Sequence, residues 1–230
     1  MLILAIDTAT RVTAVALLKN GELLAESAER SRNHSPRLFI TIERLLAANR
    51  LSPGDLRAVA VGQGPGSFTG IRVGLTLAKT LAYALDIPLL GISTLMALAE
   101  NGHEEKGPLI CPALDALKGE VFSAGFRISC DGLVMSHKEA ARDPAAWAAE
   151  LACLKKPCLI LGSAVARYRE VFEGALGKLA LFPCNESSHE VRAQAIGKLA
   201  MARLAQGETD DPRTLEPHYC RLSEAELNAR

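Results

Sequence analysis

The sequence lacks an excess of charge of either sign. Lys and Arg together number 26 and Asp and Glu together number 26, so the formal net charge is zero. A protein that binds nucleic acid by itself needs surplus Lys and Arg on one face to contact phosphates. The balance of charge therefore argues against a general polyanion binder. It is compatible with a protein that reaches nucleic acid only through a partner.

Paired metal ligands are also lacking. The six cysteines include no Cys-x-x-Cys pair, and the five histidines include no His-x-x-x-His pair. A zinc site needs such ligands at short spacing. We therefore predict no metal site and no bound cofactor, and we expect the thiols to be those of a reduced cytosolic protein.

Aromatic residues and long apolar runs are scarce. Aromatic residues make up 4% of the chain, so the core must consist of Ala, Leu, Val and Ile. No stretch approaches the roughly 20 apolar residues of a membrane span. Asp7 and Arg11 interrupt the N-terminal apolar run too early for a signal peptide. These features predict a cytoplasmic protein with no membrane association.

The patterning that is present predicts an α/β protein. Segments 2–6, 12–18 and 22–28 are typical of three antiparallel strands, and Asn20-Gly21 suits the tight turn between the last two. The rest of the first half is expected to contain helix 36–49, strand 58–61, helix 71–85 and strand 89–92.

A similar order of elements recurs in the second half, without a residue-level repeat. The expected elements are strands 109–114, 121–128, 159–161 and 179–182, and helices 143–151, 164–172 and 190–205. A polar stretch with a glycine at 101–108 separates the halves. We therefore expect two α/β lobes, residues 1–104 and residues 105–230, and the C-terminal tail is a candidate to pack back on the first lobe.

The segment from Gly62 to Gly74 has the most unusual composition, with five glycines and one proline in thirteen residues. Gly66 and Gly70 are candidates for positive φ or for close approach of another backbone. Because the segment lies between a strand and a helix start, its amides could bind an anion. A tight crossover that lets strand and helix pack is supported equally.

Three sharper motifs are excluded in this glycine loop. A phosphate-binding P-loop needs a lysine that the loop does not contain. A dinucleotide-binding fingerprint fails because Ser67 occupies a glycine position and Asp86 precedes the next strand. A hydrolase elbow fails because Pro65 and Thr69 stand where it needs glycines. Ser67 is therefore predicted to hydrogen-bond the loop backbone rather than to act as a nucleophile.

The helix after the loop carries a small residue at every fourth position, namely Gly70, Gly74, Ala78 and Ala82. Such a stripe allows a neighbouring element to approach closely. The apolar face beside it is broad, which indicates that the helix covers more than one surface. Burial within its own lobe and contact with another subunit are the two alternatives, and the pattern alone slightly favours burial.

Asp7, directly after the first strand, is the best candidate for a functional acid. A carboxylate there could orient water or a metal, or it could hydrogen-bond Thr10 or Arg11 in the turn. Asp115 and Glu120 flank a predicted hairpin, where acids are common for turn reasons alone. We predict no catalytic residue.

Two segments together resemble the TsaB family of tRNA threonylcarbamoyladenosine biosynthesis proteins. The first is Ile6-Asp7-Thr8-Ala9-Thr10, and the second, which matches throughout, is Gly64-Pro65-Gly66-Ser67-Phe68-Thr69-Gly70-Ile71-Arg72-Val73-Gly74. Three shorter matches are His34-Ser35, Ser93-Thr94-Leu95 and Pro217-His218-Tyr219-Cys220-Arg221. The resemblance is strong to about Leu98 and patchy beyond, where Leu117 and Phe122 replace the family's arginine and tyrosine.

The resemblance implies a two-lobed actin-like (ribonuclease H-like) fold in which each lobe is a mixed sheet with helices. It implies a place in the bacterial machinery that forms N6-threonylcarbamoyladenosine beside the anticodon of ANN-decoding tRNAs. Within it, the chain would be a non-catalytic subunit supporting the catalytic paralogue TsaD, with TsaE as third component. It would contact tRNA only through the complex and form a homodimer when alone.

The resemblance also implies roles for particular residues. The glycine loop comprises Gly64, Pro65, Gly66, Ser67, Phe68, Thr69, Gly70 and Arg72. A vestigial nucleotide site would comprise Asp7, Thr8 and Thr10. The partner interface would comprise Leu38, Ile42, Gly70, Gly74, Ala78 and Ala82.

Two other classes of protein stay open. One is an ATP-dependent phosphotransferase of the same fold, which Asp7 and the glycine loop support but which the turn Thr8-Ala9-Thr10 disfavours, since it lacks a phosphate-turn glycine. The other is a peptidase, supported only by an older label of the family.

Overall fold

The computed structural model describes residues 1–30, 35–102, 107–130 and 132–221, so His34 of the His34-Ser35 match lies outside the described residues. The chain divides into two compact units. Unit 1 comprises Met1–Ala97 and Val191–His218, and unit 2 comprises Leu98–Glu190 and the chain from Tyr219 onward. The expected division was 1–104 and 105–230, so the structure differs chiefly in giving residues 191–218 to unit 1.

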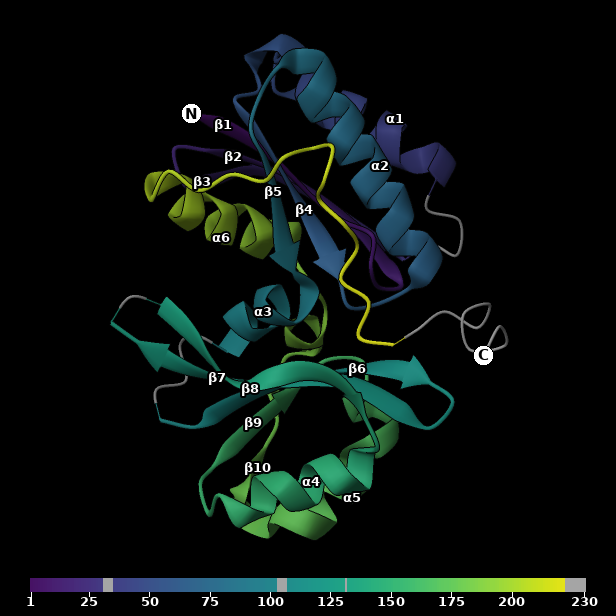
Figure 1. Cartoon of the computed structure of the whole chain (residues 1–230), viewed down its shortest axis with the longest axis vertical. Coiled ribbons are helices and arrows are strands. Elements are labelled where there is room, and N and C mark those ends of the chain that lie inside the picture. The colour runs from purple at the N-terminus through teal and green to yellow at the C-terminus, as the bar shows by residue number, and fades with distance from the viewer. Residues whose placement is uncertain (31–34, 103–106, 131, 222–230) are drawn as a thin grey trace. The chain divides into compact units, whose positions relative to one another are not determined.

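Unit 1 is built on a five-stranded mixed sheet (Figure 1). Its strands are β1 (Leu2–Asp7), β2 (Val12–Lys19), β3 (Glu22–Arg30), β4 (Ala58–Gly64) and β5 (Leu89–Ser93), in the order β3-β2-β1-β4-β5. The first three strands pair antiparallel, as predicted, and β4 is parallel to both β1 and β5. Asn20 and Gly21 both have positive φ, which the tight turn between β2 and β3 requires.

Helices cover both faces of this sheet. The helices α1 (Ser35–Ala48) and α2 (Phe68–Leu85) lie on one face, and α6 (Ala193–Ala205) lies on the other (Figure 1). A Cβ atom at Gly197 of α6 would overlap the Leu18 side chain, so the helix crosses β2 at close range. A short 3-10 helix, Pro53–Asp55, precedes β4.

The helix α2 starts three residues earlier than predicted. Ser67 is its N-cap, and the Ser67 Oγ atom accepts a hydrogen bond from the Gly70 N–H at 3.2 Å. This bond satisfies one of the amides that a helix N-terminus leaves without a partner. The first helical turn is therefore formed by loop residues that the apolar periodicity does not include.

Unit 2 has a second five-stranded mixed sheet. Its strands are β6 (Leu109–Leu117), β7 (Glu120–Ser129), β8 (Gly132–Arg142), β9 (Cys158–Leu161) and β10 (Ala180–Leu181), in the order β10-β9-β6-β7-β8. The helices α4 (Pro144–Cys153) and α5 (Val165–Leu176) pack on it through a core that includes Trp147, Leu151 and Phe172. Two short 3-10 helices, Gly177–Leu179 and Glu186–His189, follow α5.

Two elements were missed by the sequence analysis. The strand β8 is eleven residues long, but most of its side chains are exposed or half-buried, so it shows little apolar pattern. Backbone pairing with β7 forms it instead. The helix α3 (Thr94–Ala99) has six residues, which is too short for a helical periodicity to be recognised, and the boundary between the units falls within it.

The described helices include none that is long and apolar enough to cross a membrane. In unit 1, the largest fully buried side chains are aliphatic, among them Ile3, Leu4, Ile6 and Leu17. The aliphatic core that the scarcity of aromatic residues predicted is therefore confirmed in unit 1. It is wrong for unit 2, whose largest fully buried side chains are Trp147, Phe126 and Phe172.

Candidate functional site

The strand β1 ends at Asp7, whose side chain is completely buried. The Asp7 Oδ1 atom accepts a hydrogen bond from the Ala9 N–H at 3.1 Å. The Thr10 hydroxyl does not bond Asp7; it donates to the Val12 carbonyl oxygen at 3.3 Å and accepts from the Val12 N–H at 3.2 Å. Asp7 therefore acts as a turn residue through backbone amides.

Burial dominates the electrostatics of Asp7. It raises the pKa of the Asp7 carboxyl to about 7, against the backbone N–H groups of Ala9 and Thr10, which lower the pKa. Among the described residues, no group hydrogen-bonds the Asp7 Oδ2 atom or the buried Thr94 Oγ1 atom. An unpaired charged oxygen is costly in a core, so the neutral carboxylic acid is favoured below neutral pH.

Gly62 of β4 lies in direct contact with the Asp7 carboxyl. A Cβ atom at Gly62 of β4 would overlap Asp7 Oδ2, and the same position lies 3.5 Å from Thr94 Oγ1. The Asp7 carboxyl therefore fills the space where any residue other than glycine would place its side chain.

The glycine loop packs directly on the turn that follows β1. The Ser67 N–H donates to the Ala9 carbonyl oxygen at 2.7 Å, and the Thr8 hydroxyl donates to the Gly70 carbonyl oxygen at 2.7 Å. A Cβ atom at Gly66 would overlap the Ala9 carbonyl oxygen, and one at Gly70 would overlap the Thr8 carbonyl oxygen. The prediction of close backbone approach at Gly66 and Gly70 is thus confirmed, and neither has a positive φ.

These bonds favour one of the two interpretations of the loop. The Ser67 N–H is bonded to Ala9, the Gly70 N–H to Ser67 Oγ, and the Ile71 N–H to the Ser67 carbonyl oxygen. Three of the amides that could face an anion are thus bonded within the protein. The bonds support a tight crossover, and Ser67 is a backbone-bonding residue as predicted.

The remaining loop residues define its outer surface. The Arg72 guanidinium lies 3.8 Å from the centre of the Phe68 ring, and Phe68 is 37% exposed. Thr69 is exposed beside them. At the other end, Gly64 has a φ of 113° and precedes the cis peptide bond to Pro65. The first turn of α2 therefore presents an aromatic ring and a cation at the surface.

The small-residue stripe faces the interior of unit 1. All six residues expected at the partner interface are buried within the unit, namely Leu38, Ile42, Gly70, Gly74, Ala78 and Ala82. A Cβ atom at Gly74 would overlap the Thr8 hydroxyl and would lie 3.5 Å from Val61. The expectation that these side chains contact a partner is therefore corrected, because the stripe brings α2 close to its own sheet.

The exposed faces of α1 and α2 carry other apolar side chains. Phe39 and Ile40 on α1 are 50% and 45% exposed, and Tyr83 on α2 is 79% exposed. A pocket of about 290 Å³ beside Ile40 is lined by Glu29, Arg37, Thr41 and Arg44. The sequence analysis missed these positions because a helix with apolar residues on several sides does not reveal which side meets the sheet.

In unit 2, Asp115 acts as a turn residue, as predicted. Its Oδ1 atom accepts a hydrogen bond from the Leu117 N–H at 2.9 Å, and its Oδ2 atom lies 3.8 Å from the Arg167 guanidinium. Leu117, at the position of the family's arginine, is 54% exposed with a φ of 62°. Phe122, at the position of the family's tyrosine, is buried and lies 6.0 Å from the Arg221 guanidinium.

Two mixed sheets with flanking helices define the class of this protein. A solved ROK hexokinase from Thermus thermophilus superposes with a TM-score of 0.54 at 12% identity, covering 90% of this chain and 100% of that one. The chain therefore has the actin-like fold. The family model described as TsaD, tRNA N6-adenosine threonylcarbamoyltransferase, matches residues 26–229. Within that broader family, the chain belongs to the TsaB family, since it is 35% identical over 227 residues to tRNA threonylcarbamoyladenosine biosynthesis protein TsaB of Bacillus subtilis (strain 168), covering 98% of this chain and 96% of that protein.

Two further similarities agree with this family. The TsaB protein of Escherichia coli (strain K12) is 38% identical over 134 residues, which is 58% of each chain. A solved protein from Pseudomonas aeruginosa, described as similar to the peptidase YeaZ, superposes with a TM-score of 0.80 at 27% identity, covering 96% of this chain and 99% of that one. The resemblance inferred from the two N-terminal segments is confirmed.

Proposed function

We propose that this chain is a non-catalytic subunit of the bacterial machinery that forms N6-threonylcarbamoyladenosine beside the anticodon of ANN-decoding tRNAs. In this proposal it supports the catalytic paralogue TsaD in the cytoplasm, with TsaE as third component. It contacts tRNA only within that complex and pairs with a second copy of itself when TsaD is absent. Its membership of the TsaB family supports this role.

The burial of Asp7 is the observation that carries the non-catalytic part of the proposal. A general acid or base must come within hydrogen-bonding reach of a reacting group, and Asp7 has no exposed surface. The glycine loop also packs on the turn that follows Asp7, through the bonds from Ser67 to Ala9 and from Thr8 to Gly70. Asp7 therefore supports the fold of the turn rather than a reaction.

Partner contact is proposed on the outer faces of α1 and α2. Phe39, Ile40 and Tyr83 are large apolar side chains with substantial exposure, and such side chains are enriched at protein interfaces. The inner faces of both helices are buried in unit 1. The helices therefore offer a surface that is already ordered before a partner binds, which lowers the entropic cost of association.

Sedimentation of the purified protein with purified TsaD tests the interface. Phe39→Asp and Tyr83→Asp should each weaken the complex by about tenfold or more, because a carboxylate would have to be desolvated in an apolar contact. Val134→Asp is the matched control, since Val134 of β8 is 52% exposed but lies in unit 2. Unchanged association of both α1 and α2 variants would place the partner elsewhere.

Reconstituted tRNA modification tests the non-catalytic role. TsaD and TsaE should need this protein for full activity, whereas this protein alone should modify no tRNA and hydrolyse no ATP. Asp7→Asn should leave activity of the complex within a few-fold of the parent. A loss on the order of 10²–10⁴-fold, with TsaD binding intact, would instead identify Asp7 as a catalytic group.

A further inference from the structure

The last part of unit 1, residues 208–218, runs beside β5 and is here named the edge segment (Figure 1, yellow). The Asp210 N–H donates to the Leu89 carbonyl oxygen at 2.8 Å, and these two residues form an isolated antiparallel bridge. At the other end, the His218 N–H donates to the Gln63 carbonyl oxygen at 2.7 Å. The segment is therefore bonded to the sheet near both of its ends.

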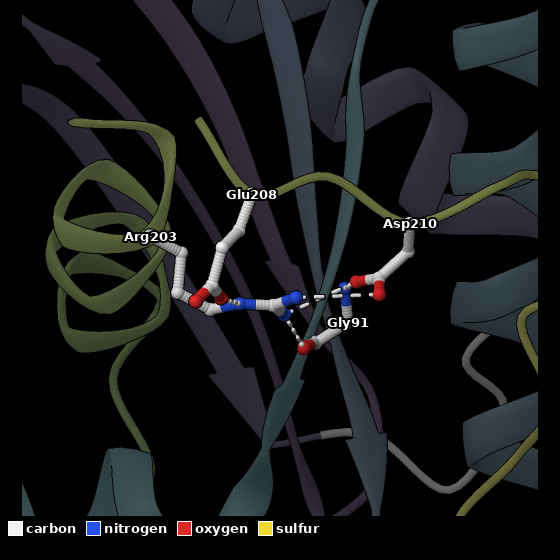
Figure 2. Close-up of polar contacts among 4 residues, drawn as sticks. All are labelled: Gly91, Arg203, Glu208 and Asp210. Atoms are coloured by element: carbon white, nitrogen blue, oxygen red, sulfur yellow. Dashed lines mark hydrogen bonds and ion pairs between the residues drawn. The ribbon is translucent and has the colours of Figure 1, made fainter. Parts of the chain in front are cut away.

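Arg203 of α6 ties the edge segment to β5 (Figure 2). Its guanidinium donates to the Glu208 carboxylate at 2.9 Å, to the Gly91 carbonyl oxygen at 2.9 Å, and to both Asp210 carboxylate oxygens at 3.1 and 3.3 Å. Asp210 also accepts from the Gly91 N–H at 2.8 Å. Such charge-assisted bonds to a planar fork are strong and directional.

The edge segment reaches the start of the glycine loop. A Cβ atom at Gly91 would overlap the Gln63 side-chain oxygen and would lie 2.9 Å from Leu215. Gly64, the last residue of β4, lies so close to the His218 carbonyl that a side chain there would clash with it. Gln63 directly precedes the loop and Gly64 is its first residue, so the edge segment contacts the backbone from which the loop departs.

We propose that the edge segment holds the glycine loop, and hence the first turn of α2, in its packed position, and that Arg203 is the positioning residue for this arrangement. The functional consequence rests on the proposed role of α2 in binding TsaD. Loss of the Arg203 contacts first releases the edge segment from Gly91. The contacts of His218 with Gln63 and Gly64 are lost next. The bond from the Ser67 N–H to Ala9 is the next one to weaken.

Amide hydrogen exchange on the full chain tests this coupling. Arg203→Ala should raise exchange by about tenfold or more at Gly91, His218, Ser67 and Gly70, because local opening exposes these amides. Amides of β2 and α1 should exchange as in the parent. The affinity for TsaD falls by the factor by which the closed fraction falls, so it should drop measurably in the variant whose exchange rates show the loop open for most of the time.

Two variants serve as controls. Arg213→Ala removes an arginine of the same segment whose side chain, among the described residues, bonds to Asp211, so loop exchange and affinity should match the parent. Arg203→Lys keeps the positive charge but lacks the planar guanidinium that bonds several acceptors at once. Its amide exchange rates should therefore lie between those of the parent and those of Arg203→Ala. If Arg203→Ala fails to fold, Asp210→Asn, which leaves the arginine in place, should give the same pattern with smaller changes.

Two results would overturn the proposal. One is faster exchange at Gly91 and His218 with parental exchange at Ser67 and Gly70, which would show that the edge segment does not hold the loop. The other is parental affinity for TsaD in a variant whose exchange rates show the loop open for most of the time. A parent protein that does not bind TsaD would contradict the proposed function instead, and the exchange data would still decide the coupling.

Discussion

The turn after the first strand is buried in unit 1 and exposed in unit 2. After β1, the turn is covered by the glycine loop, and Asp7 is buried as a carboxyl with one unpaired oxygen. Near the end of β6, the half-buried Asp115 lies 3.8 Å from the Arg167 guanidinium and accepts from the Leu117 N–H at 2.9 Å, and the turn that follows is exposed. The same residue type at the same place in a sheet therefore supports the fold through burial in one unit and through hydrogen bonding at the surface in the other.

The largest effect is expected from filling the glycine contact in unit 1. Gly70→Val should destabilise unit 1 by about 3 kcal/mol or more, because its side chain would overlap the Thr8 backbone, which cannot rotate away. Chemical denaturation followed by circular dichroism measures this loss. Gly174→Ala in unit 2 is the matched control: among the described residues, no atom beyond its chain neighbours and the adjacent helix backbone lies within 4 Å of the added Cβ. A gain of about 0.5–1 kcal/mol is expected in the helix.

A parental denaturation midpoint for Gly70→Val would show that the loop does not pack on the turn. For the same steric reason, Gly74→Glu and Ala78→Arg should unfold unit 1 rather than block a partner selectively. If either variant stays folded but no longer binds TsaD, the small-residue stripe does contact the partner.

The next effect concerns the protonation of Asp7. Its folded pKa of about 7 lies above the ordinary 3.8, so the unfolded chain releases this proton first as pH rises. The resulting penalty on folding is absent below pH 4, grows between pH 4 and 7 and is constant above, and roughly 2.5 kcal/mol of it builds up between pH 5 and pH 8. Asp7→Asn cannot ionise, so its stability relative to the parent should rise between pH 5 and pH 8.

Urea denaturation of both proteins at several pH values measures this difference. The change of stability with pH is the diagnostic quantity. The side-chain amide of the Asp7→Asn variant can itself lack a hydrogen-bond partner, and that cost would lower the stability equally at every pH. Parallel profiles for parent and variant between pH 5 and pH 8 would show that Asp7 is ionised in the folded protein.

The smallest effect is expected at the exposed turn of unit 2. Asp115→Ala should cost about 1 kcal/mol, since it removes one backbone hydrogen bond and an ion pair with Arg167, whose side chain is 58% exposed. The same denaturation assay at low and high salt separates the two contributions, because salt screens the ion pair only. A loss as large as that of Gly70→Val would remove the contrast between the two turns.

Periodicity predicted most elements because their patterns arise from burial on one face. The apolar runs of β1 and β2, the turn residues between β2 and β3, and the apolar stripe of α1 are local properties, and the structure agrees with them. The exposed strand β8 is formed by pairing with β7, which leaves almost no local pattern. The helix α6 was located nearly correctly, but its packing on the sheet of unit 1 is a long-range contact that sequence order does not contain.

The candidate site likewise combines features that the sequence predicted with features that only the structure shows. The sequence by itself determined where glycine must stand, because only glycine lets two backbones meet as Gly66 and Gly70 do with the turn after β1. It also determined the family, through the residues of that loop. Only the tertiary structure decided that Asp7 is buried, that the stripe faces the sheet, and that Arg203 reaches Gly91 from 112 positions away. Burial and long-range hydrogen bonds depend on which surfaces meet after folding, and no local pattern of residues records that.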